Sequence, residues 1–348
     1  MTSIASTDSP LFATQPVVGE PRYAPVIVVG LPRSGSSYLS HVISQIDDWY
    51  VFDDLYLFRT ARALGVDGPL TEDQLEKLVD FLGWQVRARI KWAVFDAPKC
   101  TWEDVDRMDE ALLATFRGKE VLWHELLEEW MTRLARHHGC NHWGYKAPQD
   151  FMHLGMLRQL WPDVRFIFIY RDPRRVMASK KYVDGQDGKP GEYHPLVYAR
   201  YWRMAAEAMV DADREGHVHF AQFEKLVADP TAEAAKIADF LGSRLEGELR
   251  PSKGNTSFKG GKRRSITPTE TWICERIAGD SMRALGYPDA EGRLRVQDVP
   301  DFVWTSARFT ASQALRLVRN PSARQSVSFF IKSLLSKQPR RGADHAAT

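Results

Sequence analysis

Two runs of β-branched and aromatic residues are the most apolar short stretches of the chain. Residues 26–29 (VIVV) end at Gly30, and residues 164–170 (VRFIFIY) end before Arg171. A weaker run covers residues 217–220. Short apolar runs bounded by turn residues are typical of parallel strands that are buried on both faces. We therefore predict that these runs are strands of a parallel sheet.

The apolar residues elsewhere follow a helical period. They predict a helix over residues 36–46, after the loop that follows Gly30, and several helices within residues 55–137, one of them capped by Thr71. A strand, a glycine-bounded loop and a helix in succession open an α/β domain. The predicted fold is α/β, with a P-loop-like parallel sheet flanked by helices, a mainly helical insertion and a C-terminal helical tail.

Helix ends are also marked in the sequence. Asp172 and Pro173 predict an N-cap and a first helical residue immediately after the second long strand. Residues 231–241 form a further predicted helix, which Gly242 closes. These signals place strand ends and helix starts next to each other, as an α/β sheet requires.

Some segments lack any sustained period. Residues 1–24 mix Ser, Thr, Pro and Gly, so we expect a flexible N-terminal arm, and residues 184–195 (DGQDGKPGEYHP) predict a flexible loop. The first twenty residues have neither a basic residue nor an apolar core, and no run of eighteen apolar residues exists, so neither a signal peptide nor a transmembrane helix is expected. Three scattered cysteines fit a reducing, cytoplasmic compartment.

The net charge of +2 conceals a basic C-terminus. Residues 303–341 contain eight basic residues and no acidic one, which leaves 39 basic against 45 acidic residues in the rest of the chain. Apolar residues alternate with the basic ones, and Pro321 separates two predicted helices. One interpretation is peripheral contact of this tail with anionic lipid at the inner face of a membrane. The other is a helix packed on the domain with a solvated basic face.

The segment GLPRSGSS (residues 30–37) has the spacing of a phosphate-binding loop. A nucleoside triphosphatase loop needs Lys after its second glycine, but Ser36 occupies that position and the cation is Arg33, inside the loop. Backbone N–H groups at a helix N-terminus bind anions without a metal. An arginine-bearing anion cradle suits a phosphosulfate; the alternative is a strand–turn–helix connection that happens to contain two glycines.

A second segment, RDPRRVMAS (residues 171–179), follows the long strand. Arg171 stands at the carboxyl end of the strand, where open α/β sheets bind ligands, and Ser179 lies eight residues further along the predicted helix. Taken singly, Arg171 could pair with a surface carboxylate and Ser179 could be a solvated helix residue.

Together the two segments resemble the PAPS-dependent sulfotransferase family of the bacterial type, where PAPS is 3′-phosphoadenosine-5′-phosphosulfate. GLPRSGSSYL is similar to the family's 5′-phosphosulfate loop, and RDPRRVMAS to its 3′-phosphate motif. The resemblance covers residues 25–290, the expected sulfotransferase domain, with 291–348 as a basic helical tail. It implies that Arg171 and Ser179 hold the 3′-phosphate. It also implies that the phosphosulfate is held by Arg33, Ser34, Gly35, Ser36 and Ser37.

Three further segments strengthen this resemblance. WGYKAP (residues 143–148) is similar to the family's Lys-x-Pro segment, which makes Lys146 a catalytic candidate. FEKLVADP (223–230) resembles a segment whose Tyr contacts the adenine region; Phe223 stands in its place, so stacking remains available without the hydroxyl. SFKGGKRR (257–264) resembles the loop that closes over the 3′-phosphate, with Lys262 and Arg263 as candidates, although several registers fit.

Sulfuryl transfer needs a base for the acceptor and positive charge for the departing oxygen. Arg33 and Lys146 are the candidates for the charge. Some family members place a Glu about twenty residues after the loop arginine, where this chain has Asp53 and Asp54; spacing favours Asp54 as the catalytic base. The alternative is that these aspartates cap the next helix.

The remaining predictions concern the acceptor, metals and partners. Tryptophans at 84, 92, 102, 123 and 130 suggest core packing or an apolar acceptor site within the 55–140 insertion. The histidines of HHGCNH (residues 137–142) match no zinc spacing, so no metal is expected. We predict a PAPS-dependent sulfotransferase acting on a small-molecule or lipid-like hydroxyl acceptor, with no nucleic acid partner. A P-loop small-molecule kinase and a non-catalytic PAP-binding or lipid-docking module are the alternatives.

Overall fold

A computed structural model describes residues 9–18, 24–92, 95, 97–183, 193–213, 216–249 and 265–319. The chain divides into two compact units. The first contains Met1–Arg171 and Glu207–Gly260, and the second contains Asp172–Ala206 and Gly261–Thr348.

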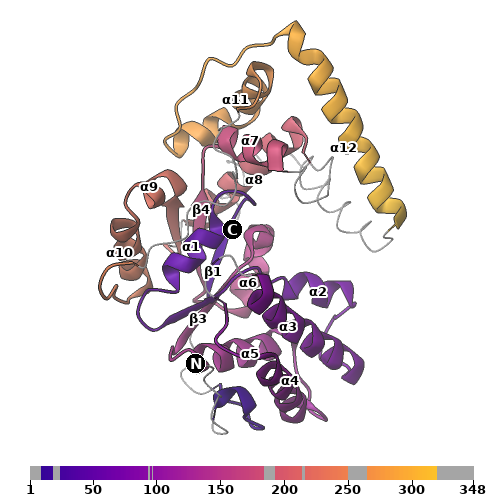
Figure 1. Cartoon of the computed structure of the whole chain (residues 1–348), viewed down its shortest axis with the longest axis vertical. Helices are drawn as coiled ribbons and strands as arrows, with labels where there is room; N and C mark the ends of the chain where they lie inside the picture. The colour runs from indigo at the N-terminus through magenta and orange to yellow at the C-terminus, as the bar shows by residue number, and fades with distance from the viewer. Residues whose placement is uncertain are drawn as a thin grey trace, which may run out of the picture. The chain divides into compact units, whose positions relative to one another are not determined.

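The first unit is built on a five-stranded sheet with the order β2-β3-β1-β4-β5, in which every neighbouring pair is parallel (Figure 1). The strands are β1 (Val26–Gly30), β2 (Trp49–Phe52), β3 (His142–Lys146), β4 (Arg165–Tyr170) and β5 (Val218–Gln222). Parallel pairing brings all five carboxyl ends to one edge of the sheet. The predicted α/β class with a parallel sheet is therefore confirmed.

The central strand β1 is fully buried, as its unbroken apolar run predicts. Its glycine fits a close contact: a Cβ atom on Gly30 would lie 2.4 Å from the carbonyl oxygen of Ile169 in β4. Gly144 in β3 also has no room for a side chain, because a Cβ atom there would lie 2.3 Å from a methyl group of Val26. Both glycines thus allow β1 to pack tightly between its two neighbours.

Helices cover the sheet. One face packs on α1 (Ser36–Ile43), α9 (Phe223–Ala228) and α10 (Pro230–Leu241). Their apolar side chains share a core with β1, β2, β4 and β5, including Leu39, Ile167, Ala221 and Ile237. The helix α10 ends at Gly242 in the left-handed conformation, as predicted.

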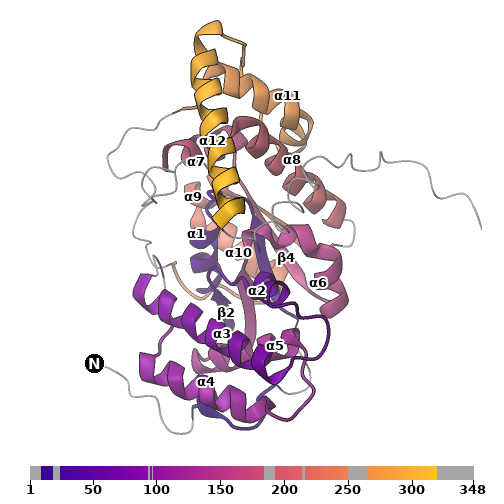
Figure 2. The same cartoon turned by 90° about the vertical axis from the view of Figure 1, so that its right-hand side faces the viewer.

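Residues 55–140 are mainly helical, as the apolar period predicts. They form α2 (Leu57–Ala63), α3 (Glu72–Trp92), α4 (Trp102–Phe116) and α5 (Trp123–His137). The helices α3 and α4 lie side by side (Figure 2). The 3-10 helix η2 (Pro148–His153) and α6 (Leu154–Leu160) then lead from β3 to β4.

The expected N-terminal arm is packed on this helical region where the structure describes it. Residues 9–18 include the 3-10 helix η1 (Pro10–Phe12), and Leu11 is 1% exposed. The backbone N–H groups of Val17 and Val18 donate to the Glu129 carboxylate in α5 at 2.9 to 3.1 Å. The sequence predicted a flexible arm because this segment has no repeating pattern of apolar residues. A single buried leucine and a few backbone hydrogen bonds do not produce such a pattern.

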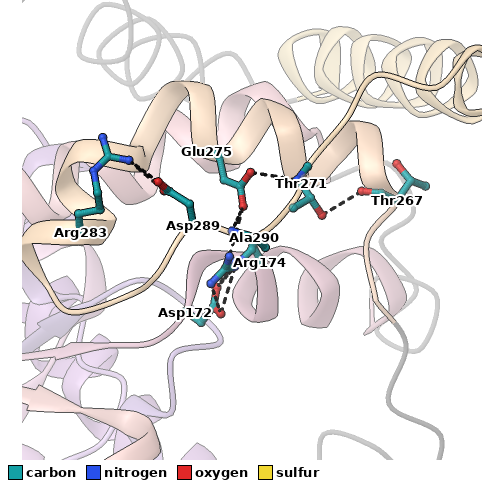
Figure 3. A network of polar contacts seen from close by, with 9 residues as sticks. Asp172, Arg174, Thr267, Thr271, Glu275, Arg283, Asp289 and Ala290 are labelled. Carbon is teal, nitrogen blue, oxygen red and sulfur yellow. Dashed lines mark hydrogen bonds and ion pairs between the residues drawn. The ribbon is translucent and has the colours of Figure 1, made fainter.

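The second unit contains α7 (Pro173–Val183), α11 (Pro268–Ala284), η4 (Val296–Asp298) and α12 (Val299–Arg319). The helix α8 (Pro195–Ala212) begins in this unit and ends in the first. Figure 3 shows Arg174 of α7 between the carboxylates of Asp172 and Glu275. This ion-pair network ties α7 to α11, and the predicted cap Asp172 also accepts from the Arg174 backbone.

The structure contains two strands that were not predicted, and three tryptophans are more exposed than expected. The strands β2 and β3 were not predicted, because β2 has four residues and β3 contains Gly144 and Lys146. Trp130 is buried, but Trp84, Trp92 and Trp102 are more than half exposed, so they form neither core nor pocket. None of the helices in the described ranges combines the length and apolarity that crossing a membrane requires.

Candidate active site

The loop after β1 has the backbone geometry of an anion cradle. Arg33 and Gly35 adopt positive φ angles of 78° and 96°, and Ser34 N–H donates to the Leu31 carbonyl at 3.1 Å. Gly35 is the N-cap of α1 and gives that helix no side-chain cap. The first N–H groups of α1 are therefore left for a ligand, and the helix dipole adds positive potential there.

Arg171 lies against this loop. Its guanidinium donates to the backbone carbonyl of Arg33 at 3.4 Å and lies over the ring of Phe223 at 4.5 Å. The same ring leaves no space for a side chain at Gly35, since a Cβ there would lie 2.2 Å from it. Two arginines 138 positions apart in the sequence and the aromatic residue after β5 thus meet around one loop.

Lys146 approaches the loop from β3. Its side chain is buried, and its Nζ atom donates to the hydroxyl of Ser37 at 3.0 Å. The same ammonium lies 2.5 Å from Oδ1 of Asp54 and 2.9 Å from Oδ1 of Asp53. The lysine, the loop and both candidate bases therefore form one cluster.

Two more residues complete this cluster. The Tyr56 hydroxyl donates to Asp54 Oδ1 at 3.0 Å, and Arg89 of α3 lies 3.3 Å from Asp53 Oδ2 and 3.6 Å from Asp54 Oδ2. Burial raises the pKa of Asp54, but Lys146, Arg89 and the Tyr56 hydroxyl together outweigh burial and hold that pKa below its ordinary value. Asp54 is an ionised carboxylate in this arrangement.

A cavity of about 180 Å³ opens beside the cluster. Ser37 and Asp53 of the cluster are among its lining residues. Two stacked ring pairs also line it, His41 with Phe95 at a centroid distance of 5.0 Å and Tyr50 with His138 at 4.3 Å. The other lining residues are Ser40, Ser44, Trp49, Val51, Phe52, Arg89, Ala97, Pro98, Lys99 and Cys140. The lining therefore combines aromatic rings with three serines and the cations Arg89 and Lys99.

Each strand thus contributes to one edge of the sheet at its carboxyl end. The contributions are the loop after Gly30, Asp53 and Asp54 after β2, Lys146 at the end of β3, Arg171 after β4 and Phe223 after β5. Open parallel sheets bind ligands at this edge.

The sequence profile described as the Sulfotransferase family matches residues 25–247, which is more than half of the chain. The chain belongs to the sulfotransferase family. No curated protein matches it. Its enzyme class is accordingly that of the transferases that move a sulfuryl group.

Several solved structures are similar to this sulfotransferase. The sulfotransferase domain from the curacin biosynthetic pathway is 17% identical, with 77% of this chain and 94% of that chain covered and a TM-score of 0.46. The sulfotransferase domain from the Synechococcus PCC 7002 olefin synthase is 17% identical, with 83% and 94% covered and a TM-score of 0.45. The sulfotransferase from Alicyclobacillus acidocaldarius is 15% identical, with 76% and 97% covered and a TM-score of 0.44.

The contacts above do not include three predicted site residues of the sulfotransferase. Ser179 is buried in α7 of the second unit, and its contact with a 3′-phosphate stays a prediction. Lys262 and Arg263 lie outside the described residues. Arg89 and Tyr56 were not predicted as site residues. Tyr56 could have been suspected because it stands two residues after Asp54. Nothing in the sequence links Arg89 to Asp53, which is 36 positions earlier.

The histidines of the HHGCNH segment have structural contacts. His137 Nε2 is hydrogen-bonded to the Lys99 carbonyl at 2.7 Å, and the Lys99 N–H donates to His138 Nε2 at 3.0 Å. These two bonds fix the backbone of Lys99, which lines the cavity. His142 stacks on Trp49. Within the described ranges, no group of three or more His, Cys, Asp or Glu side chains is arranged to hold a metal ion.

Proposed function

We propose that this sulfotransferase transfers the sulfuryl group of PAPS to a hydroxyl of a ring-shaped or slender apolar acceptor. One observation carries the proposal: Lys146 and Arg171, from strands on opposite sides of β1, both donate hydrogen bonds to the loop after β1. An anion in that loop would lie between two fixed cations, with Arg33 as a third.

The loop suits the 5′-phosphosulfate end of the donor. The uncapped N–H groups of α1 and the hydroxyls of Ser36 and Ser37 provide donors for its oxygens. The hydroxyl of Ser34 fits the same role, since its Oγ atom is buried and has no hydrogen-bond partner among the described residues. Arg171 and the Phe223 ring would hold the nucleotide end, the arginine through charge and the ring through stacking.

The transfer itself is an in-line displacement. The acceptor oxygen forms a bond to sulfur while the bond from sulfur to the bridging phosphate oxygen breaks, which releases 3′,5′-adenosine bisphosphate (PAP). Arg33 and Lys146 stabilise the charge that develops on the departing oxygen. The proton of the acceptor hydroxyl goes to the Asp54 carboxylate.

Lys146 also regulates the strength of that base. While the ammonium is paired with Asp54, the pKa of the carboxylate is held low. An anion in the loop competes for the same ammonium, so the influence of burial, which raises the pKa of Asp54, gains weight. Arrival of the donor would thus turn a weak base into a stronger one.

The cavity beside Asp53 is the proposed entrance for the acceptor. A cavity of about 150 Å³ is large enough to admit benzene, so about 180 Å³ admits one ring or a short aliphatic segment. The stacked aromatic pairs favour an apolar body, and Lys99, which also lines the cavity, can contact a polar or anionic group of the acceptor.

The donor is tested by thermal unfolding and by transfer. We expect PAP to raise the melting temperature and ATP at equal concentration to leave it unchanged, because the loop has no Walker lysine. Radiolabelled PAPS is then incubated with pools of phenols, sugars and hydroxylated lipids, and label should pass to an acceptor with an apolar body. Protection by ATP with none by PAP would favour a kinase, and protection by PAP with no transfer to any pool would indicate a non-catalytic module.

The entrance is tested by narrowing the cavity. Ser44→Leu adds apolar volume to the cavity wall formed by α1, so we expect the KM of the acceptor to rise at least about tenfold while PAP binding is unchanged. Ser281→Leu, which alters a half-buried helix serine that does not line the cavity, is the matched control. Equal acceptor KM values for both variants would place the acceptor elsewhere.

A further inference from the structure

The helix α12 has one face that is held within the second unit. Its Phe302 and Phe309 rings lie 5.8 and 5.3 Å from the ring of His194, and Ser306 is hydrogen-bonded to that histidine at 3.0 Å. At the start of the helix, Asp301 pairs with Lys181 of α7 at 2.6 Å. These contacts fix which side of α12 points away from the unit.

The other side of α12 is apolar and exposed. Trp304 is 63% exposed and Val318 is 76% exposed, and Val303 and Leu315 are also about half exposed or more. Residues 303, 307, 311, 314 and 318 are spaced by three or four, so they form one line along the helix, with 304 and 315 beside it. The small side chains of Ala307, Ala311 and Ala314 lie in the middle of this line. They border a shallow groove that Phe302, Val303, Ser306 and Thr310 also line. This outward face of α12 offers an aromatic residue and two valines to solvent over most of the helix.

Arginines border the outward face. Arg308 and Arg319 are exposed, each four residues after one of the flanking apolar residues Trp304 and Leu315, and neither forms an ion pair with a residue that the structure describes. Asp301, the acidic residue of α12, forms an ion pair with Lys181. The sequence from 303 to 341 contains eight basic residues and no acidic one, so nothing in it neutralises this border.

We propose that the outward face of α12 binds the surface of an anionic lipid bilayer. An exposed apolar face with a tryptophan, bordered by arginines, is the pattern of helices that lie in the plane of a membrane interface. The arginines decide between possible occupants: two copies of this face would bring like charges together, whereas anionic headgroups complement them. This membrane contact would be made by the second unit and does not depend on the proposed transfer reaction.

The test uses the full chain and vesicles of phosphatidylcholine with or without phosphatidylserine, separated by sedimentation. We expect binding that requires phosphatidylserine and weakens with added salt. Arg308→Gln with Arg319→Gln should weaken binding about 30-fold, since each cation near such a surface contributes about 1 kcal/mol. Trp304→Ser with Leu315→Ser should weaken it at least as strongly, because the apolar anchor is lost.

Control variants test whether a loss of vesicle binding comes from the outward face of α12 or from another change in the protein. Trp102→Ser changes another tryptophan that is more than half exposed, in α4, and should leave vesicle binding unchanged. Each variant is accepted only if its melting temperature matches that of the wild type. A chain ending at Arg319 should retain binding that still depends on Trp304. The proposal is overturned if the Trp304/Leu315 variant binds vesicles as the wild type does, or if light scattering shows that this variant converts a dimer to a monomer without changing vesicle binding.

Discussion

Asp54 experiences two opposing influences in the candidate site. Its partial burial favours the neutral carboxyl, while Lys146, Arg89 and Tyr56 favour the carboxylate and prevail. Asp54 also has a positive φ angle of 59°, a conformation that aspartate tolerates better than most residues. Its side chain is therefore placed by both backbone and ion pairs, which is the preorganisation that a general base requires.

The roles of Asp54 and Arg33 can be separated by substitution. Asp54→Asn removes the proton acceptor but keeps the shape, so we expect normal PAP binding and a loss of turnover of about 10²–10⁴-fold. Arg33→Ala removes a proposed ligand of the phosphosulfate, so we expect both PAP binding and turnover to fall. Thermal shift and radiolabel transfer measure the two quantities. Turnover of Asp54→Asn equal to that of the wild type would eliminate Asp54 as the base and leave Asp53→Asn as the next variant to measure.

Asp150 gives the stability of the protein a pH dependence. It is buried in η2, and burial raises its pKa to about 7 despite a hydrogen bond from Tyr145 at 3.2 Å. Between about pH 4 and about pH 7 the unfolded chain has lost this proton while the folded chain keeps it, so stability falls as pH rises through this range. Asp150→Asn should remove this decline and stabilise the protein above pH 7 by about 2–4 kcal/mol.

Urea unfolding at several pH values measures this effect. Asp163→Asn, at an exposed position between α6 and β4, is the matched control and should behave like the wild type. A wild-type stability that stays flat or rises between pH 5 and 7, with Asp150→Asn parallel to it, would contradict the predicted pKa of Asp150.

The sequence predicted the residues of the site whose neighbours form a local pattern. Gly30, Arg33 and Gly35 belong to one loop, and Lys146 and Arg171 each stand in a short recognisable segment. Arg89 carries no such pattern, because its partners come from a distant strand end and only the packing of α3 brings them together. Pairings of this kind are set by tertiary structure, which a single sequence does not reveal.

At the scale of elements, the apolar runs of β1 and β4 were predictable, whereas the four-residue strand β2 and the strand β3, which contains a glycine and a lysine, were not. The strands β1 and β4 are buried along nearly their whole length, so their composition identifies them. The strand β3 includes Gly144, which fits tight packing on β1, and Lys146, which serves the site. The strand β3 therefore has a glycine and a lysine at positions where β-branched residues would have made it recognisable as a strand.

The helix α5 contains a fully buried ion pair, Glu129 with Arg133 at 2.8 Å. Arg133 also donates to Thr115 of α4 at 2.9 Å and to the Leu11 carbonyl at 3.5 Å. Glu129 in turn accepts the backbone N–H groups of residues 17 and 18. The pair therefore connects α4, α5 and the N-terminal segment.

Removing one member of this pair should be costly. Arg133→Met leaves the Glu129 charge buried without its cation, so we expect a loss of about 3–5 kcal/mol in the free energy of unfolding. Adding Glu129→Gln should recover part of that loss, because the uncompensated charge disappears. Lys77→Met breaks an exposed pair, Lys77 with Asp73, and should cost less than about 1 kcal/mol. Similar losses for Arg133→Met and Lys77→Met in urea titrations would refute the structural role of the buried pair.

Across the whole molecule, the candidate site is assembled from segments that lie far apart in the sequence. Hydrogen–deuterium exchange should therefore show protection by PAP in four separate peptides, around residues 30–37, 146, 171 and 223, and little change across α3 and α4. The measurement also tests Ser179, since protection of α7 would support its predicted contact with the 3′-phosphate. Protection confined to one peptide would refute a site shared by several strand ends.

The register of the sheet has a consequence for the tolerance of the chain to insertions. Gly30 of β1 is paired with Ile169 of β4, two positions before Arg171. One residue inserted within β4 would shift the arginine by about 3.3 Å and send it to the opposite face. The same insertion at residues 162–163, where the chain turns toward the start of β4, would leave that register intact. Natural length variation in close relatives should therefore accumulate at the amino edge of the sheet and be rare at its carboxyl edge.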